Sequence, residues 1–408
     1  MKRLYRKRRK GETFALLVCA LSEAKGMEKN MKENKTIFSK LNRIAIARIR
    51  NMLSEHKPFY MADLHIHSIY SADSVLRSED ILSIARNNDI EIISVTDHDS
   101  VDFYLNNDSF LQKYIMNPCE FPIILPGIEF TVKYTMYSTM CHILQYGIDI
   151  ASNEFANDLY LNKIAYWNRI KKQFQRVYEN SALQCFEAFH PENFNIKNFI
   201  RFYKDNHIIT LPDYCIVMEY IFDTLETGNI PIRTLSESIR REINKDPCEL
   251  RRFKRINAFN GIKFEENNNK FQQIKIISKL LAPRGVDDDE YDGYESSGSL
   301  SINDFGQISI ESLNANGITV WAHPNEDKLY LIDDIMKFKC KVSGIELNVR
   351  NIHACNKCLK EICMKYGLFY TVGSDNHGTK TNLYKESSCY RLPFDELYKL
   401  YSCLIGGI

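Results

Sequence analysis

The stretch Ala62-Asp63-Leu64-His65-Ile66-His67-Ser68 constrains the fold more than any other part of the chain. Successive residues of a β-strand alternate between its two faces, so His65 and His67 project from one side while Leu64 and Ile66 pack on the other. Two imidazoles at the end of a strand either form hydrogen bonds in a wet cleft or bind a metal ion. This pair alone leaves both interpretations open.

Length and composition restrict the class of protein. A chain of 408 residues can form one large α/β domain with an insertion, or two to three ordinary domains. Lys and Arg total 53 and Asp and Glu total 52, so no global charge would attract a nucleic acid, and no membrane partner is expected. The 12 cysteines form no secreted-type framework, which favours a cytoplasmic location. Cys355, Cys358 and Cys363 lie close together, but a structural zinc site would need a second pair.

Residues 1–57 are predicted to be a basic leader followed by a helix. Seven of the first ten residues are Lys or Arg, and a short apolar run follows at 14–21. This run resembles a signal peptide only superficially, because Ser22 and Glu23 interrupt it and Met27 begins a more ordinary polar leader. A disordered leader, or a start codon placed too early, is therefore favoured over export. A helical period over residues 36–55 predicts the helix.

Short apolar runs alternate with helical periods in two regions, residues 58–150 and 306–408. Strands are expected at 60–65, 90–95, 122–128, 142–148, 318–322, 344–347 and 369–373, and helices at 78–88, 327–339 and 353–366. This alternation predicts a parallel sheet with helices on both faces.

Residues 151–305 interrupt the alternation and are predicted to be a helical insertion that ends in an acidic, Ser-rich linker. Seven basic residues between Arg240 and Arg255 could follow a nucleic acid backbone. Three acidic residues interleave them, so a solvated helix face is the favoured interpretation. A nucleic acid partner therefore stays an alternative.

Polar motifs occur at five of the expected strand ends. The motifs are His65-Ile66-His67-Ser68, Thr96-Asp97-His98-Asp99, Gly127-Ile128-Glu129, Ala322-His323-Pro324 and Gly373-Ser374-Asp375-Asn376-His377-Gly378, and His142 opens a further strand. Each motif alone is more often structural, but the ends of parallel barrel strands converge on one mouth. Imidazoles mixed with carboxylates, without cysteine, suit Zn²⁺, Mn²⁺ or Fe²⁺. More than four such groups indicate two or more metal ions that share a bridging carboxylate.

These motifs, in this order, resemble the metal motifs of the PHP (polymerase and histidinol phosphatase) superfamily over residues 60–150 and 306–380. The resemblance implies a distorted (β/α)7 TIM-like barrel with two or three divalent metal ions that hydrolyses phosphoesters. Carried over position by position, the ligands would be His65, His67, Asp73, His98, Glu129, His142, His323, Asp375 and His377, with Glu129 bridging two metal ions.

Asp73 departs from one form of the family pattern. In the branch that degrades small nucleotides and short RNA, an aspartate lies at the position of Ala72. Other members have the form Tyr-Ser-X-Asp-Ser, which Tyr70-Ser71-Ala72-Asp73-Ser74 matches, so Asp73 is taken as the ninth ligand. The insertion is longer than the family's usual one, and the substrate pocket is not carried over.

The expected reaction is hydrolysis of a phosphomonoester, in a phosphorylated small molecule or a nucleotide, by a hydroxide that bridges two metal ions. Asp97 and Asp99 are catalytic candidates because they flank His98 and could orient it, although a plain hydrogen-bonding role is the alternative. Arg350 could hold a substrate phosphate, but an exposed loop arginine is the commoner case.

Two other functions compete with the phosphomonoesterase. One is a nuclease that acts on RNA or DNA ends, which the basic segment of the insertion would favour. The other is a non-catalytic regulatory module that retains its metal ions. Lost ligands would ordinarily accompany that role, and only the Ala72/Asp73 position is irregular here. The sequence leaves the oligomeric state open.

Overall fold

The computed structural model describes only part of the chain. The described residues are 36–106, 108–134, 139–150, 152–179, 195–212, 216–217, 220, 309–310, 313, 317–325, 328–329, 331–332, 342–349, 351, 353–378, 384 and 387–406. The expected leader, the basic segment at 240–255, the acidic linker and Arg350 lie outside these residues, as does most of the helix expected at 327–339.

The chain forms two compact units. One consists of residues 25–162 and 307–408, and the other of residues 1–24 and 163–306. The domain boundaries predicted at 58, 151 and 306 stay a prediction. All nine expected metal ligands belong to the first unit.

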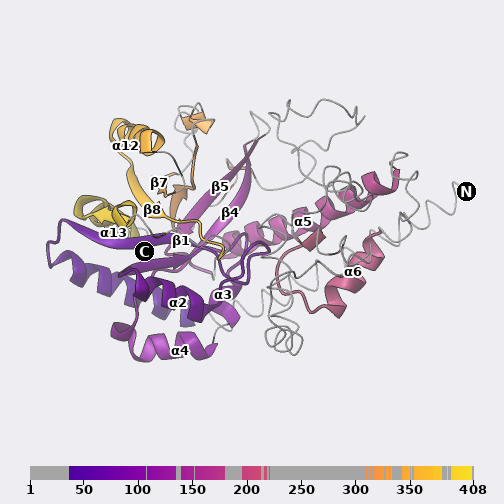
Figure 1. Ribbon diagram of the computed structural model, residues 1–408, viewed down its shortest axis with the longest axis horizontal. Helices are drawn as coiled ribbons and strands as arrows, with labels where there is room; N and C mark the ends of the chain where they lie inside the picture. Colours follow the sequence, from indigo (N-terminus) through magenta and orange to yellow (C-terminus); the bar gives the residue numbers. More distant parts are fainter. Residues whose placement is uncertain are drawn as a thin grey trace, which may run out of the picture. The chain divides into compact units, whose positions relative to one another are not determined.

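The first unit is a mixed α/β structure (Figure 1). Its strands are β1 (Phe59–Ile66), β2 (Ile92–Val95), β3 (Ile123–Ile124), β4 (Gly127–Tyr134), β5 (Thr139–Tyr146), β6 (Ile318–Trp321), β7 (Gly344–Asn348), β8 (Phe369–Gly373) and β9 (Arg391–Pro393). Its helices are an unlabelled one over residues 36–53, α2 (Ser78–Asn87), α3 (Asp102–Asn106), α4 (Asp108–Met116), α12 (His353–Tyr366) and α13 (Phe394–Gly406), with 3-10 turns η1 (Pro118–Glu120) and η6 (Ser387–Tyr390).

The strands pair in two sheets, ordered β3-β2-β1-β9 and β4-β5-β6-β7-β8. The pairs β1/β2, β2/β3, β6/β7 and β7/β8 are parallel, as expected. The expectation is wrong for β5, which runs antiparallel to both β4 and β6. Only four residues separate β4 from β5, too few for the crossover that a parallel pair needs.

Two isolated bridges connect the two sheets. Ile66, the last residue of β1, bridges Asn376 beyond β8, and His98 beyond β2 bridges Glu129 on β4. Among the residues that the structure describes, continuous strand pairing does not close a ring, so the expected (β/α)7 barrel is not confirmed. The two bridges nevertheless bring the polar motifs of four strands to the same end of the unit.

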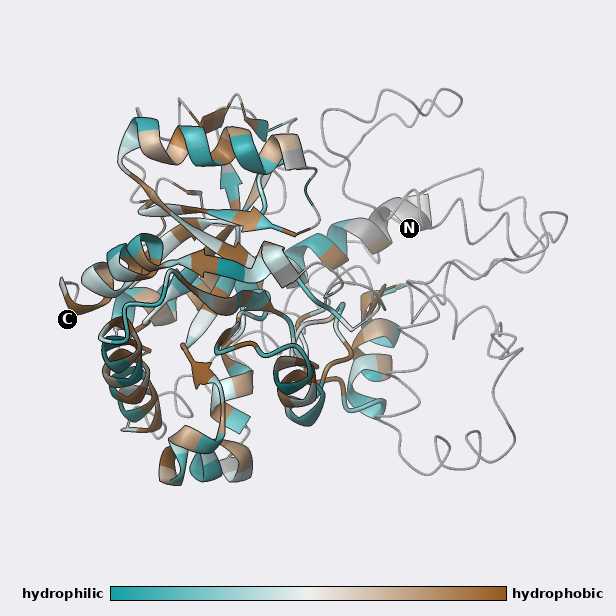
Figure 2. Cartoon of the chain, turned by 60° about the vertical axis from the view of Figure 1, so that its left-hand side comes forward, coloured by the Kyte–Doolittle hydropathy of each residue, from teal (hydrophilic) through white to brown (hydrophobic). Residues whose placement is uncertain are grey.

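The helices cover the strands with apolar stripes (Figure 2). In the helix over residues 36–53, Phe38, Leu41, Ala45 and Ile49 recur every three or four positions and are buried, as a 3.6-residue period requires. Helix α12 packs against β7 and β8, and α13 packs against β8 and β9. This core holds the strand ends, and therefore the polar motifs, in place.

The described part of the second unit is helical. Helix α5 (Asn153–Glu179) starts in the first unit and continues into the second, where α6 (Ile196–Asp205) follows. Within the second unit, the ring centroids of Phe174 and Phe199 are 5.3 Å apart and those of Trp167 and Tyr203 are also 5.3 Å apart, so aromatic side chains form its core. Among the described residues, no helix is long and apolar enough to cross a membrane.

Candidate metal centre

The structure brings all nine expected ligands into one cluster, and most of them follow the carboxyl ends of strands. His65 and Glu129 lie within β1 and β4, and His142 lies within β5. The others follow strand ends: His67 after β1, Asp73 in the loop before α2, His98 after β2, His323 after β6, and Asp375 and His377 after β8. Residues as far apart in sequence as 65 and 377 thus share one site.

Glu129 lies at the centre of the cluster with its side chain fully buried. Its two oxygens face different histidines. Oε2 lies 3.2 Å from His65 Nε2, 3.1 Å from His67 Nε2 and 3.0 Å from His98 Nδ1, whereas Oε1 lies 2.9 Å from His142 Nδ1 and 3.1 Å from His323 Nε2. A carboxylate that presents each oxygen to a separate set of ligand atoms has the arrangement that bridges two cations.

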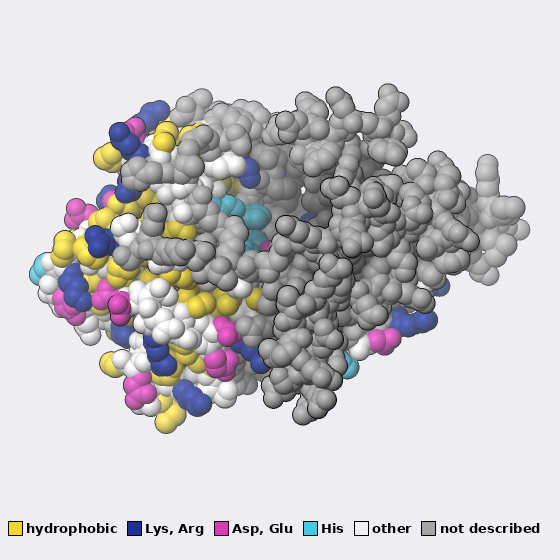
Figure 3. Space-filling view, in the orientation of Figure 1, with side chains coloured by type: hydrophobic (Ala, Val, Ile, Leu, Met, Phe, Trp, Pro, Cys, Tyr) yellow, Lys and Arg dark blue, Asp and Glu magenta, His cyan; other side chains and the backbone are white. Residues whose placement is uncertain are grey.

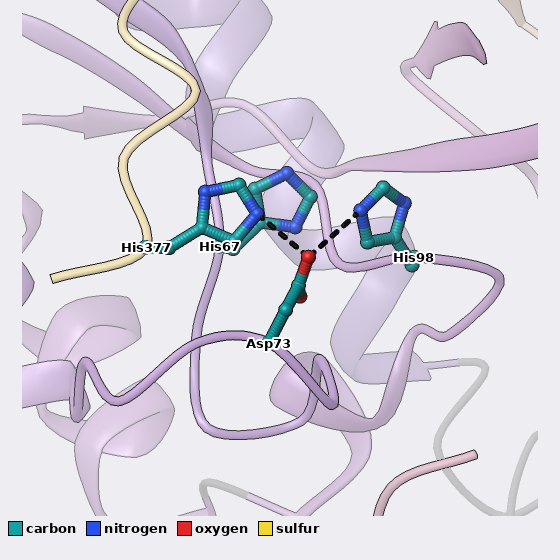
Figure 4. Close-up of side chains that lie close together, drawn as sticks. All are labelled: His67, Asp73, His98 and His377. Atoms are coloured by element: carbon teal, nitrogen blue, oxygen red, sulfur yellow. Dashed lines mark ion pairs between the residues drawn. The ribbon is translucent and has the colours of Figure 1, made fainter. Parts of the chain in front are cut away.

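A second group gathers around Asp73 (Figure 4). Asp73 Oδ2 lies 3.0 Å from His377 Nε2 and 3.4 Å from His98 Nε2, and the ring of His67 completes the group. The ring centroids of His67 and His377 are stacked 4.1 Å apart. Asp73 therefore supplies the carboxylate in this part of the cluster, and the preceding residue, Ala72, has none to offer.

The remaining carboxylate, Asp375, connects the groups. Its Oδ1 lies 3.2 Å from His67 Nε2 and 3.6 Å from His65 Nε2. These three residues form a further set whose ligand atoms could surround one ion. The positive φ of 50° at Asp375 turns the chain here, a conformation that Asp tolerates better than most residues.

Several atoms of the cluster fit a cation better than they fit one another. Within the described part of the chain, Glu129 Oε2, His98 Nδ1 and Asp73 Oδ1 are buried and form no hydrogen bond, which is costly for polar atoms, and this holds even though the first two lie 3.0 Å apart. His65 Nε2 faces His67 Nε2 at 3.0 Å. Two nitrogens bound to one zinc ion at its usual bond length lie about 3.0–3.4 Å apart. The donor set therefore suits divalent metal ions.

The cluster is deeply buried on one side and open on the other. The side chains of His65, His67 and Glu129 are fully buried, whereas those of His142 and His323 are 30% and 27% exposed. Histidine side chains gather in one place on the face shown in Figure 3. A small molecule would therefore reach the cluster from the side of His142 and His323.

Carboxylates and imidazoles shift one another's protonation. Burial opposes the charged form of Glu129, but His65, His98 and His142 lower its pKa well below the ordinary value. Burial likewise opposes protonation of His65, but the Glu346 and Glu129 carboxylates raise its pKa well above the ordinary value. Desolvation lowers the pKa of His142 to about 4. The carboxylates are thus held ionised, as metal ligation requires.

Asp97 and Asp99 hold the backbone around the cluster. Asp97 accepts hydrogen bonds from the backbone N–H and the Oγ of Ser68, both at 2.6 Å. Asp99 Oδ1 accepts from the backbone N–H of Thr131 at 3.1 Å and from Asn162 Nδ2 at 2.6 Å. These contacts connect the loop that carries His98 to Ser68 after β1, to Thr131 on β4 and to Asn162 on α5. They are hydrogen bonds of the plain kind expected from the sequence as the alternative to a catalytic role.

Sequence reasoning missed two residues that contact the rings. Ser71 Oγ lies 3.0 Å from His67 Nδ1 and accepts from the backbone N–H of His98 at 2.9 Å. Glu346, on β7, lies 3.0 Å from His65 Nδ1 and is fully buried. The signal for Glu346 was its acidic side chain inside an otherwise apolar strand, Gly344-Ile345-Glu346-Leu347. Such a residue is rarely buried without a partner.

Comparisons with known proteins give no assignment of the chain. No protein-family model matches it, and no curated protein matches it. The solved structures that are similar to it include the following two. A "putative metal-dependent phosphoesterase" from Bifidobacterium adolescentis is 14% identical, with a TM-score of 0.47, over 81% of this chain and 96% of that one. An amidohydrolase from Chromobacterium violaceum, with bound sulfate and no metal, is 16% identical, with a TM-score of 0.45, over 82% and 98%. With both TM-scores below 0.5, neither structure defines the family or the reaction of this chain.

Proposed function

We propose that this chain is a metal-dependent phosphoesterase that hydrolyses a phosphomonoester of a small metabolite or a nucleotide. The observation that supports this most is the position of Glu129, whose two buried oxygens face separate sets of histidine nitrogens. The motifs at the strand ends, which resemble those of the PHP superfamily, support the same proposal. Paired metal ions held by such ligands are a recurrent arrangement for displacement at phosphorus.

Two or three divalent ions, Mn²⁺, Zn²⁺ or Fe²⁺, would supply an activated water molecule and positive charge against the phosphoryl oxygens. Glu129 would hold two of them, with His142 and His323 on one side and His65, His67 and His98 on the other. Asp73 and His377 would hold the third.

The chain's own residues would orient the ligands and limit access to water. Glu346 and Ser71 contact the far nitrogens of His65 and His67 and thereby fix the directions of those rings. The buried floor at Glu129 would exclude water, and the partly exposed His142 and His323 would form the rim through which the phosphate enters.

Metal loading followed by a phosphate-release screen tests the proposal. Protein purified without metal is loaded with Mn²⁺ or Zn²⁺ and its metal content is measured. It is then offered sugar phosphates, mononucleotides, nucleoside bisphosphates and short oligonucleotides, with amides as a comparison class. We expect more than one ion per chain and phosphate release that a chelator abolishes. Oligonucleotide cleavage without monoester hydrolysis would favour the nuclease, and metal binding without any turnover would favour the regulatory module.

A further inference from the structure

We propose that Glu346 is a positioning residue that orients two ligands of the proposed metal centre, His65 and His323, at the same time. Its carboxylate fixes the proton of His65 on Nδ1 and holds the backbone of His323 in the conformation that aims its ring at Glu129. The inference depends on the proposed metal centre, because His65, Glu129 and His323 form one of the sets that could surround an ion.

The contact with His65 determines which ring nitrogen faces the cluster. Glu346 Oε1 and Oε2 lie 3.0 and 3.1 Å from His65 Nδ1. Both carboxylate oxygens lie at hydrogen-bond distance from this one nitrogen, and Oε2 also accepts from the backbone N–H of His323, so the geometry assigns Nδ1 as the donor. In the neutral ring, Nε2 then has a free lone pair, and it is Nε2 that lies 3.2 Å from Glu129 Oε2. A carboxylate behind the ring also makes this nitrogen a stronger ligand.

The same carboxylate holds His323. Its Oε2 accepts a hydrogen bond from the backbone N–H of His323 at 2.7 Å. His323 has a φ of +30°, in the left-handed region that non-glycine residues rarely adopt. In this conformation, the Nε2 atom of His323 lies 3.1 Å from Glu129 Oε1. Glu346 thus stabilises the strained backbone conformation that points the ring of His323 toward Glu129.

The burial of Glu346 indicates that a positive charge belongs near it. The side chain is fully buried, and in the described part of the chain its close polar contacts are the His65 ring and the His323 N–H rather than a Lys or Arg. A buried carboxylate without Lys or Arg is unfavourable unless another charge balances it. A cation bound on the far side of the His65 ring would supply that charge.

Gly373, on β8, leaves the space that this arrangement occupies. A Cβ atom at position 373 would overlap Glu346 Oε1 and would lie 2.5 Å from His65 Cβ. Because no other residue lacks a Cβ, only glycine lets β8 pass beside the pair without displacing it. Glu346, His65 and Gly373 therefore pack closely against one another.

Measuring the Zn²⁺ affinity of the Glu346→Gln variant tests the proposal. Glutamine keeps one acceptor oxygen but turns an NH₂ group toward one of the two donors, so it cannot serve both His65 and His323. Competition of Zn²⁺ with a chromophoric chelator should show at least one ion bound about 10–100-fold more weakly than in wild type. Glu396→Gln is the matched control, because Glu396 accepts from the backbone N–H of Tyr370 on the same strand as Gly373 and does not contact the cluster residues described here. It should bind Zn²⁺ as wild type does.

Wild-type affinity in Glu346→Gln would overturn the positioning role, provided that wild type itself binds Zn²⁺. Wild-type protein that binds no Zn²⁺ or Mn²⁺ would instead overturn the proposed metal centre, so the two failures are distinguishable. ¹⁵N NMR of Zn²⁺-loaded wild type gives a readout that needs no variant to fold. The ring of His65 should carry its proton on Nδ1, and a proton on Nε2 would contradict the proposal.

Discussion

Asp63 on β1 and Ser374 beyond β8 form two hydrogen bonds across 311 residues of sequence: the Ser374 N–H donates to Oδ1 at 2.9 Å and Ser374 Oγ to Oδ2 at 2.7 Å. Tyr384 donates a third, at 2.6 Å, to Oδ2. Burial raises the pKa of Asp63 to about 6, and these three donors oppose the shift. They hold the loop that carries Asp375 and His377 against the strand that carries His65. The metal centre therefore depends on polar contacts that belong to no ligand.

Glu129→Gln should empty or separate the central metal pair. Glutamine keeps the volume of glutamate but lacks the charge that lets two cations lie close together. We expect at least one metal ion per chain to be lost and turnover of any phosphoester to fall on the order of 100-fold or more. Metal content and kcat should be measured on this variant and on Glu120→Gln, an exposed residue of η1. Full metal content with near-wild-type turnover would exclude the bridging role.

Asp73→Asn should remove one ion and leave the pair at Glu129. Asp73 Oδ2 is the carboxylate oxygen that faces His377 Nε2 and His98 Nε2, and the amide that replaces it is a much weaker ligand for Zn²⁺ or Mn²⁺. Metal analysis at saturating Mn²⁺ should show one ion fewer than wild type. Asp89→Asn, on an exposed turn with a φ of 52°, is the control because Asn tolerates that conformation. An unchanged count in Asp73→Asn would show that Asp73 holds no ion.

Asp99→Ala should lower stability more than Asp99→Asn. Alanine removes the oxygen that accepts hydrogen bonds from the Thr131 N–H and from Asn162 Nδ2. Losing these bonds should lower the free energy of unfolding by about 1–3 kcal/mol. Asparagine retains an acceptor oxygen and tolerates the φ of 48° at this position. Denaturant unfolding of both variants measures the difference. If Asp99→Ala unfolded like wild type but lost turnover, Asp99 would act in the reaction instead.

Cys119 and Cys363 should differ in reactivity toward a maleimide at pH 8. Cys119 is exposed, whereas Cys363 is buried between α12 and β8. Burial raises the pKa of the Cys363 thiol to about 12, so at pH 8 it stays in the protonated, unreactive form. Peptide mapping by mass spectrometry should find Cys119 labelled first and Cys363 labelled only after denaturation. Equal labelling rates in native protein would contradict the packing of α12.

Sequence periodicity was sufficient to predict the positions of several strands. The strands expected at 60–65, 344–347 and 369–373 correspond closely to β1, β7 and β8, because their apolar runs are short and end in turn residues. The strand expected at 122–128 is instead two strands, β3 and β4, since the chain changes partner at Pro126-Gly127. Strand direction and sheet membership depend on these long-range pairings, which a local pattern does not contain.

The candidate site was predicted in part for the same reason. The nine expected ligands lie together because most of them follow strands that the sequence predicted. Their role as ligands stays a prediction. Glu346 was missed because its partners, His65 and His323, are 281 and 23 residues away. A lone glutamate within an apolar strand does not reveal which ring it will contact. Its buried position became evident only from the folded arrangement.

His142 and His323, whose Nδ1 and Nε2 atoms lie 3.2 Å apart, are separated by 181 residues of sequence, and this separation has a consequence for biosynthesis. At about 5–20 residues per second, a ribosome needs roughly 10–40 s to pass from the first to the second. During that interval, the nascent chain has six of the nine expected ligands, His65, His67, Asp73, His98, Glu129 and His142, but lacks the three supplied after the insertion. An ion that needs ligands from both sides of the insertion could therefore bind fully only after residue 377 has been synthesised and the two halves of the unit have come together.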